Sequence, residues 1–255
     1  MKIQYVSDIH LELLTFNERC IYLDTVERTC DILVLAGDIG NPMKNHYKHF
    51  LRKVGELFEK IFIIAGNHEY YGNTIDETNE KIMEVVSEFS NITFLNNSYE
   101  DYRGVRWIGT TLWTEIIKKT LFRMNDYRVI KDFDISKYNE LHYKCKTFLE
   151  SSLQTASEEN IKTVVITHHL PFYELTNPYY RKPCYSHISM LFNANISDII
   201  DKYKTHIVGW FYGHTHKHSI QTHYGVDFHC NPIGYFDEIN REELIRLNKN
   251  CIINI

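Results

Sequence analysis

The chain has 255 residues, of which 44% are hydrophobic and 14% aromatic, so it can bury a sizeable core and is not a disordered chain. Its formal net charge of −5 gives no overall attraction to nucleic acid or to an acidic membrane surface. The N-terminus lacks the apolar stretch of a secretory signal, and no run of about 18 apolar residues occurs, so we expect a cytoplasmic protein without a membrane partner.

Short runs rich in Val and Ile recur along the chain, and they predict strands because each run is closed by small or polar residues. Between the second and third runs, apolar residues recur at helical spacing from Met43 to Phe58, and Pro42 suits a helix start. This part therefore predicts a strand–helix–strand unit. The predicted strands are Lys2–Val6, Asp31–Ala36, Ile61–Ala65, Val105–Gly109, Thr163–Thr167, His206–Tyr212 and Gly225–His229.

Two further helices follow the first. Thr74 and Glu77 form a capping box before an apolar stripe, and a third helix is predicted from about Asn139 to Glu159. The alternation predicts an α/β fold with helices on the outer faces of a sheet and with ligands in the loops after the strands. We expect a single domain over residues 1–255, because neither an internal repeat nor a linker rich in Pro, Gly or Ser occurs. The segment Pro171–Ser197 resembles a long loop at a site.

Five of the predicted strands end in Asp, Asn or His. One such end alone is typical of a turn, and a single His pair is typical of an ordinary surface. Five ends with the same placement are hard to explain as turns and indicate a metal site instead, because such folds place their ligands in the loops after the strands. The five ends are Ser7-Asp8-Ile9-His10, Gly37-Asp38, Gly66-Asn67-His68-Glu69, His168-His169 and Gly213-His214-Thr215-His216.

The number of donors at these ends suits two ions. One ion takes about four to six donors, so the set is large enough for two divalent cations that share a bridging carboxylate. Mixed oxygen and nitrogen donors without thiolate favour Mn, Fe, Zn or Co, with Mn as the first choice in vitro. The candidate donors are Asp8, His10, Asp38, Asn67, His168, His169, His214 and His216.

These blocks make the sequence similar to the calcineurin-like metallophosphoesterases. The family signature of Asp-x-His, Gly-Asp, Gly-Asn-His-Asp/Glu, His and Gly-His-x-His is matched in order from Asp8 to His216. The resemblance implies a four-layer α/β/β/α sandwich of the metallo-dependent phosphatase type. His168 is preferred to His169 as a ligand because it directly follows the strand. The implied ligands are Asp8, His10 and His216 for one ion and Asn67, His168 and His214 for the other, with Asp38 as the bridge.

The resemblance also implies that His68 lies beside the phosphate and stabilises the transition state or protonates the leaving oxygen. A hydrogen bond to a metal ligand is its alternative role. Arg128 and His169 are candidate substrate contacts, although a polar segment such as the one around Arg128 is more often a solvated loop. Tyrosines close to the metal blocks in sequence can stack a base or an aryl group, or can simply pack at the rim. These are Tyr70, Tyr71, Tyr173, Tyr179 and Tyr180.

One position departs from the family pattern. Many relatives carry an acidic residue two or three positions after the Gly-Asp block, where this chain has Ile39-Gly40-Asn41. The departure affects a contact beside the ligands, so it puts the substrate preference in doubt more than catalysis.

The function that the resemblance implies is metal-dependent hydrolysis of phosphate mono- or diesters of small molecules, nucleotides included. A hydroxide that bridges two cations would attack phosphorus directly, so no Ser or Cys nucleophile is needed. Two alternatives remain open: a metal-dependent nuclease with the same centre, and a non-catalytic scaffold of the same fold. The acidic composition and the absence of recognisable DNA-binding segments disfavour the nuclease, and the complete ligand set disfavours the scaffold.

Overall fold

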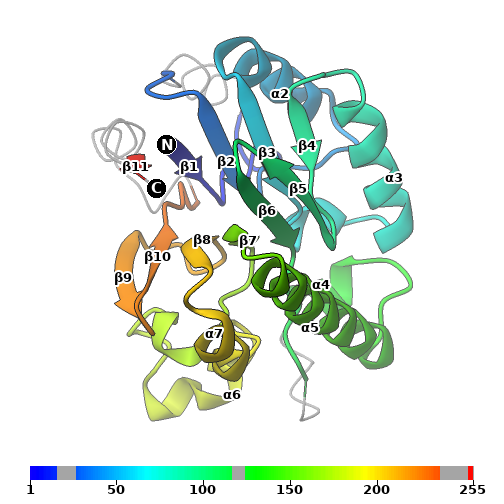
Figure 1. The fold of residues 1–255 in the computed structure, drawn as a ribbon. Helices are drawn as coiled ribbons and strands as arrows, with labels where there is room; N and C mark the ends of the chain where they lie inside the picture. Colours follow the sequence, from blue (N-terminus) through cyan, green and yellow to red (C-terminus); the bar gives the residue numbers. More distant parts are fainter. Residues whose placement is uncertain (16–26, 117–123, 236–251, 255) are drawn as a thin grey trace.

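The computed structural model of the chain describes residues 1–15, 27–116, 124–235 and 252–254, which form two sheets with helices outside them (Figure 1). The first sheet has the strand order β11-β1-β2-β3-β4 and the second has the order β5-β6-β7-β8-β10-β9. In the first sheet the strands are β1 (Lys2–Val6), β2 (Ile32–Ala36), β3 (Lys60–Ile64), β4 (Ile92–Phe94) and β11 (Ile252–Asn254). In the second they are β5 (Ser98–Tyr102), β6 (Val105–Thr110), β7 (Lys162–Thr167), β8 (Ile207–Tyr212), β9 (Ser219–His223) and β10 (Val226–Cys230).

The strands that carry the polar ends are parallel to their neighbours. In the first sheet β1, β2 and β3 pair in parallel, and in the second β6, β7 and β8 do so. The carboxyl ends of β1, β2 and β3 therefore lie at one edge of the first sheet, and those of β7 and β8 lie at one edge of the second.

The helices begin where local capping directs them. Helix α3 begins with the predicted capping box of Thr74 and Glu77, which the structure confirms. Helix α5 begins at Ile135 rather than Asn139, because the Asp134 side chain accepts a hydrogen bond from the Lys137 N–H. The α-helices are α2 (Asn45–Leu57), α3 (Ile75–Val86), α4 (Asn125–Val129), α5 (Ile135–Glu158), α6 (Ser186–Ser189) and α7 (Ser197–Tyr203). The 3₁₀ turns are η1 (His68–Tyr70), η3 (Tyr173–Leu175) and η4 (Pro183–Tyr185).

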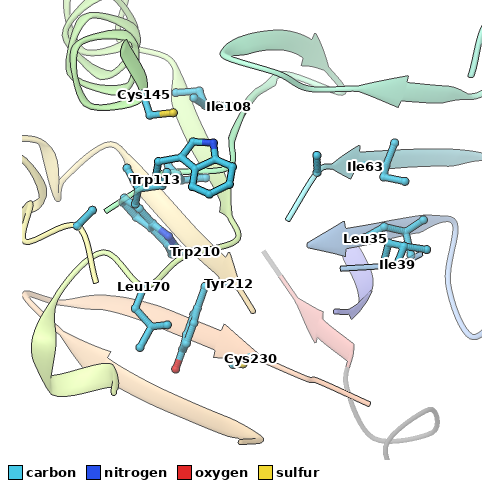
Figure 2. Close-up of a cluster of buried hydrophobic side chains, with 14 of the residues drawn as sticks. Leu35, Ile39, Ile63, Ile108, Trp113, Cys145, Leu170, Trp210, Tyr212 and Cys230 are labelled. Atoms are coloured by element: carbon cyan, nitrogen blue, oxygen red, sulfur yellow. The ribbon is translucent and has the colours of Figure 1, made fainter. Parts of the chain in front are cut away.

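The two sheets pack face to face over a layer of buried apolar side chains. Alternate residues of β1 to β3 meet alternate residues of β6 to β8 there, and the rings of Phe62 and Trp107 stack across it at 4.3 Å. The other faces of the strands belong to a second cluster beneath the helices, which includes Leu35 and Ile63 of the first sheet and Trp210 and Tyr212 of the second (Figure 2). The result is the predicted α/β/β/α sandwich.

The sequence pattern missed the edges of the sheets. β4, β5, β9 and β11 were not predicted, and the burial of β5 and β9 alternates between exposed and half-buried, so neither is a continuous apolar run. The segment Pro171–Ser197 is more ordered than the predicted long loop, because it contains η3, η4 and α6 and because an isolated parallel bridge joins Asn193 to Leu170, just beyond the end of β7. Among the described residues, no helix has the length and apolar character needed to cross a bilayer.

Gly109 is a test of how closely the sheets approach. A Cβ at Gly109 would lie 2.2 Å from Leu95 Cβ and 2.8 Å from Ile64 Cγ2, so Gly109→Ala should lower the free energy of unfolding by about 1–3 kcal/mol through overpacking. The matched control is Gly55→Ala in α2, where the nearest atoms are 3.6 Å away and the higher helix propensity of Ala should stabilise by about 0.5–1 kcal/mol. Urea unfolding measures both values, and an equal unfolding free energy for the two variants would contradict this packing.

Candidate metal centre and active site

The loops that follow the strands are joined by backbone hydrogen bonds within each sheet, and one further hydrogen bond joins the loops of the two sheets. The Asp8 N–H donates to the Gly37 carbonyl at 3.0 Å, and the His10 N–H donates to the Asp38 carbonyl at 2.9 Å. In the second sheet the Gly213 N–H donates to the His168 carbonyl at 3.0 Å. A side-chain bond joins the sheets, because the His214 N–H donates to Asp8 Oδ1 at 2.9 Å. Residues far apart in sequence therefore form one polar cluster.

Several of the predicted ligands have a backbone conformation that non-glycine residues rarely adopt. The φ angle is +52° at Asp8, +51° at His10, +53° at Asp38, +67° at His214 and +46° at His216. Asp, Asn and His tolerate this left-handed region better than other residues, at a cost of about 1–3 kcal/mol each. A left-handed residue turns the chain sharply at the end of its strand. Five of the predicted ligands are therefore strained, although residues away from the cluster, such as Asn97 and Leu112, also have a positive φ.

The structure brings the predicted ligands together as two groups of potential donors. Asp8, His10 and His216 form one group, and Asp38, His168 and His214 form another, with one donor atom of each residue within 4.8 Å of the others in its group. A third group, of His10, Asp38 and His68, overlaps both and adds His68 to the cluster. In the first group His10 Nε2 lies 3.0 Å from His216 Nε2, and His216 Nε2 lies 3.5 Å from Asp8 Oδ1.

Asp38 lies between the two groups. Its Oδ2 atom is 3.3 Å from His168 Nε2 and 3.9 Å from His10 Nε2. Its Oδ1 atom accepts the backbone N–H of His68 at 2.8 Å. The carboxylate is thus oriented by its own loop contacts, with one oxygen facing both sets of imidazoles.

Asn67 adds an amide oxygen to the second group. Its Oδ1 atom lies 3.1 Å from His168 Nε2. Its amide nitrogen donates to Asp126 Oδ1 at 2.8 Å and to the Tyr71 hydroxyl at 3.1 Å, and that hydroxyl donates to the same Asp126 oxygen at 2.7 Å. Asp126 and Tyr71 therefore hold the amide with its oxygen toward the donors.

His168 and His169 have different surroundings. His168 Nδ1 lies 3.0 Å from the Ala36 carbonyl, which leaves Nε2 for Asp38 and Asn67. His169 is fully buried, its Nδ1 lies 3.2 Å from the Thr111 carbonyl, and it belongs to neither group of donors. Burial and the neighbouring His168 lower the pKa of His169 to about 3.

The donors also satisfy an electrostatic test for a divalent cation. Asp8, Asp38 and Asp126 are buried, and the ion pairs that the described residues make with Asp8 and Asp38 come from His side chains. Buried carboxylates of this kind need a paired charge or a metal ion. Mixed carboxylate, amide and imidazole donors fit a first-row divalent cation.

Protonation of His168 would supply such a charge. Burial lowers the pKa of His168, but the facing Asp38 carboxylate outweighs it and raises that pKa to about 10. Burial raises the pKa of Asp38, yet His168, His68 and His10 together hold it well below its usual range. A cation at this position would replace the proton on His168, so metal binding should release protons.

His68 lies at the mouth of this cluster. Its ring stacks on Tyr71 at 4.2 Å, and its Nδ1 atom lies 3.2 Å from Glu12 Oε1. Burial lowers the pKa of His68, whereas Asp38 and Glu12 raise it to about 9. The ring is therefore held between an aromatic face and a carboxylate.

A cavity of about 340 Å³ opens over the donors. Its lining combines polar residues with the side chains of Tyr180, Ile188, Leu191 and Phe192 from the segment Pro171–Ser197, which together we call the apolar side of the cavity. Arg128 is exposed and is not in the lining, whereas Asp126 of the same helix is. Tyr71 and Tyr180 line the cavity; Tyr173 and Tyr179 are exposed, and Tyr70 packs in the core against Trp113. The lining includes Asp38, Asn67, His68, Tyr71, Met124, Asn125, Asp126, Asn177, Tyr180, Ile188, Leu191, Phe192, His214, Thr215, His216 and Tyr235.

Sequence reasoning missed Glu12, Asp126, Phe192 and Tyr235. Asp126 lies in a segment that the sequence had singled out, but no pattern distinguished it from Arg128. Glu12 follows His10 by two residues, and this spacing was the available signal. No sequence signal pointed to Phe192, because only the fold of its segment brings its ring to the site. The centroid of that ring lies 5.2 Å from that of His214.

Comparisons with known proteins agree with this geometry. A family model described as calcineurin-like phosphoesterase matches residues 1–218. An uncharacterized protein of Acanthamoeba polyphaga mimivirus is 32% identical over 265 residues, which cover 93% of this chain and 92% of that protein.

Two solved structures share the fold at low sequence identity. Phosphopantetheinyl hydrolase from Mycobacterium tuberculosis has a TM-score of 0.72 at 14% identity, with 93% of this chain and 90% of that chain covered. A dimetal phosphatase from Danio rerio has a TM-score of 0.57 at 9% identity, with 90% of this chain and 86% of that chain covered.

Asp126 offers a test of the metal centre that does not depend on activity. Asp126→Ala removes the acceptor that orients Asn67, so the affinity for Mn²⁺ should fall by about 10–100-fold. Isothermal titration calorimetry of metal-stripped protein measures this, with Asp198→Ala on an exposed turn of α7 as the control. Unchanged Mn²⁺ affinity in a folded Asp126 variant would show that the amide of Asn67 is not a ligand held in this way.

Proposed function

The chain belongs to the calcineurin-like phosphoesterase family, and on that basis we propose that it is a metal-dependent hydrolase of phosphate mono- or diesters of small molecules. The observation that carries the proposal is the convergence of two donor groups around Asp38, with His68 beside them at the wall of one cavity. The family and the phosphatase neighbours support a hydrolase acting on a small phosphorylated substrate.

In this proposal two divalent cations bind at the two donor groups, with Mn²⁺ as the first choice in vitro. Asp38 is shared, because one of its oxygens faces both groups. When bound, the cations would supply Lewis acidity, lower the pKa of water and neutralise charge on the phosphate. The proposed ligands are Asp8, His10 and His216 on one side and Asn67, His168 and His214 on the other.

The chain's own residues orient the substrate and assist the leaving group. His68 lines the cavity, and its Nδ1 atom is already directed at Glu12. Its other ring nitrogen, Nε2, is therefore the atom available to the leaving oxygen, to which it can donate a hydrogen bond or a proton. The backbone N–H of His68 donates to Asp38 Oδ1, so His68 is held at a fixed position relative to the proposed bridging carboxylate.

The organic part of the substrate would lie against the apolar side of the cavity. Phe192 packs against Tyr180 with ring centroids 5.0 Å apart, and Ile188 and Leu191 continue this surface. All four side chains are only half-buried although they lie beside the donors. Half-buried apolar surface inside a polar site is typical of a binding contact. We therefore propose esters whose alcohol carries a flat, uncharged group such as an aryl ring or a nucleobase.

The alternatives receive less support. Polynucleotide binding depends on neutralising phosphates with Lys and Arg, and neither residue type occurs in the cavity lining formed by the described residues. A scaffold role would not need the complete donor set. A cytoplasmic location stays a proposal, to which the thiols of Cys30, Cys145 and Cys184, outside any disulfide, are suited.

Metal dependence and the role of His68 can be tested together. Metal-stripped protein should hydrolyse an aryl phosphomonoester or an aryl phosphodiester only after Mn²⁺ is added, and the ratio of the two rates gives its preference.

His68→Ala should lower kcat by about 10²–10⁴-fold, and Asp38→Asn should remove most activity. Near-normal turnover by either folded variant would overturn the role assigned to that residue.

The apolar side of the cavity gives a separate prediction. Tyr180→Ala should raise KM for an aryl ester about tenfold, which corresponds to about 1.4 kcal/mol of lost contact, and should leave KM for the matching ethyl ester unchanged. Tyr173→Ala is the control, because Tyr173 belongs to the same segment but is exposed and outside the described lining. Equal effects of Tyr180→Ala on both esters would contradict a ring-binding surface.

A further inference from the structure

Glu12 lies where two imidazoles of the site meet. Its Oε1 atom is 3.2 Å from His68 Nδ1 and 3.4 Å from His10 Nδ1. The side chain is 17% exposed, and those of His68 and His10 are 13% and 1% exposed. A single, largely buried carboxylate oxygen thus faces two rings, which themselves pack edge to face at 4.4 Å.

Since Nδ1 of each ring faces Glu12, the other ring nitrogen, Nε2, is the one directed at the proposed metal and substrate sites. His10 Nε2 lies among the donors, 3.0 Å from His216 Nε2 and 3.9 Å from Asp38 Oδ2. His68 lines the cavity, with Tyr71 stacked on one face of its ring. In each ring the Nδ1 atom faces Glu12, so the carboxylate sets which nitrogen each imidazole presents to the site.

Gly40 leaves room for the loop that carries Glu12. A Cβ at Gly40 would lie 2.9 Å from Leu11 Cβ and would crowd that loop, whereas its distance of 3.6 Å from Glu12 Oε2 would be an ordinary contact. The sequence Ile39-Gly40-Asn41 contains no acid. The carboxylate beside His68 comes instead from the loop after β1, the same loop that supplies Asp8 and His10.

We infer that Glu12 is a positioning residue with two functions: it orients His10 toward a bound cation and His68 toward the leaving oxygen of the ester. The second function rests on the proposed hydrolase activity, and the first does not. Because one oxygen serves both rings, loss of Glu12 should affect metal affinity and leaving-group assistance together.

The main test compares Glu12→Gln with the wild type on phenyl phosphate and p-nitrophenyl phosphate, or on the corresponding diesters if those are preferred. The ring is the same in both esters, but the phenolate leaves less readily than the nitrophenolate, so it needs more help from His68. In Glu12→Gln, kcat for the phenyl ester should fall about tenfold more than kcat for the nitrophenyl ester, with KM unchanged. In a His68→Ala background, Glu12→Gln should add no further leaving-group effect.

The second readout is Mn²⁺ affinity, measured by calorimetry without substrate. Glu12→Gln should weaken binding about tenfold, as loss of a carboxylate behind a ligating imidazole does. Glu80→Gln, on an exposed position of α3, is the matched control and should change neither readout. If Glu12→Gln does not fold, Glu12→Asp keeps the charge and should give intermediate values for both.

The outcomes separate the two proposals. Equal losses of kcat on both esters together with unchanged Mn²⁺ affinity would overturn the role of Glu12. A wild type that hydrolyses none of the esters would refute the proposed function as tested. In that case the Mn²⁺ measurement alone decides whether Glu12 positions His10.

Discussion

The site depends on one buried carboxylate that touches none of the proposed metal positions. Glu69 is fully buried, and its two oxygens accept the backbone N–H groups of Asp38, Ile39, Gly40 and Gly66 at 2.7–3.3 Å. Burial and the nearby Asp38 raise the pKa of Glu69, while the four donors stabilise its charged form. These bonds tie the loop after β2 to the loop after β3. The distance between Asp38 and Asn67 follows from that connection.

Close approach of the two loops has a steric requirement as well. A Cβ at Gly66 would lie 2.2 Å from Asp38 Oδ1, so this position accepts only glycine. The left-handed residues of the other loops add conformational cost at the same edge. The apolar layer between the sheets offsets these costs, because its Val, Ile and aromatic side chains are almost completely buried. A stable sandwich thus maintains a strained, highly charged edge.

The fold and the donors were predictable because both depend on patterns that are local in sequence. Apolar runs predicted β2, β3 and β7 to within one residue, and the polar ends of those runs contained residues that the structure brings together. Partners chosen by tertiary contact were not predictable. Asp126 can be recognised as part of the site only when the fold places Asn67 beside it. Half-exposed edge strands such as β5 contain no apolar run that a sequence pattern could detect.

The candidate metal ligands and the residues that hydrogen-bond to them therefore determine different properties of the site. The spacing from Asp8 to His216 predicts the family and the kind of chemistry, because it determines which atoms can meet. Glu12, Glu69 and Asp126 determine how firmly those atoms are oriented, and each comes from a different segment: the loop after β1, η1 and α4. The apolar side of the cavity comes from yet another segment, between β7 and β8. If the proposed function holds, substitutions in that segment should change the preferred alcohol without moving a donor, because the donors come from other loops.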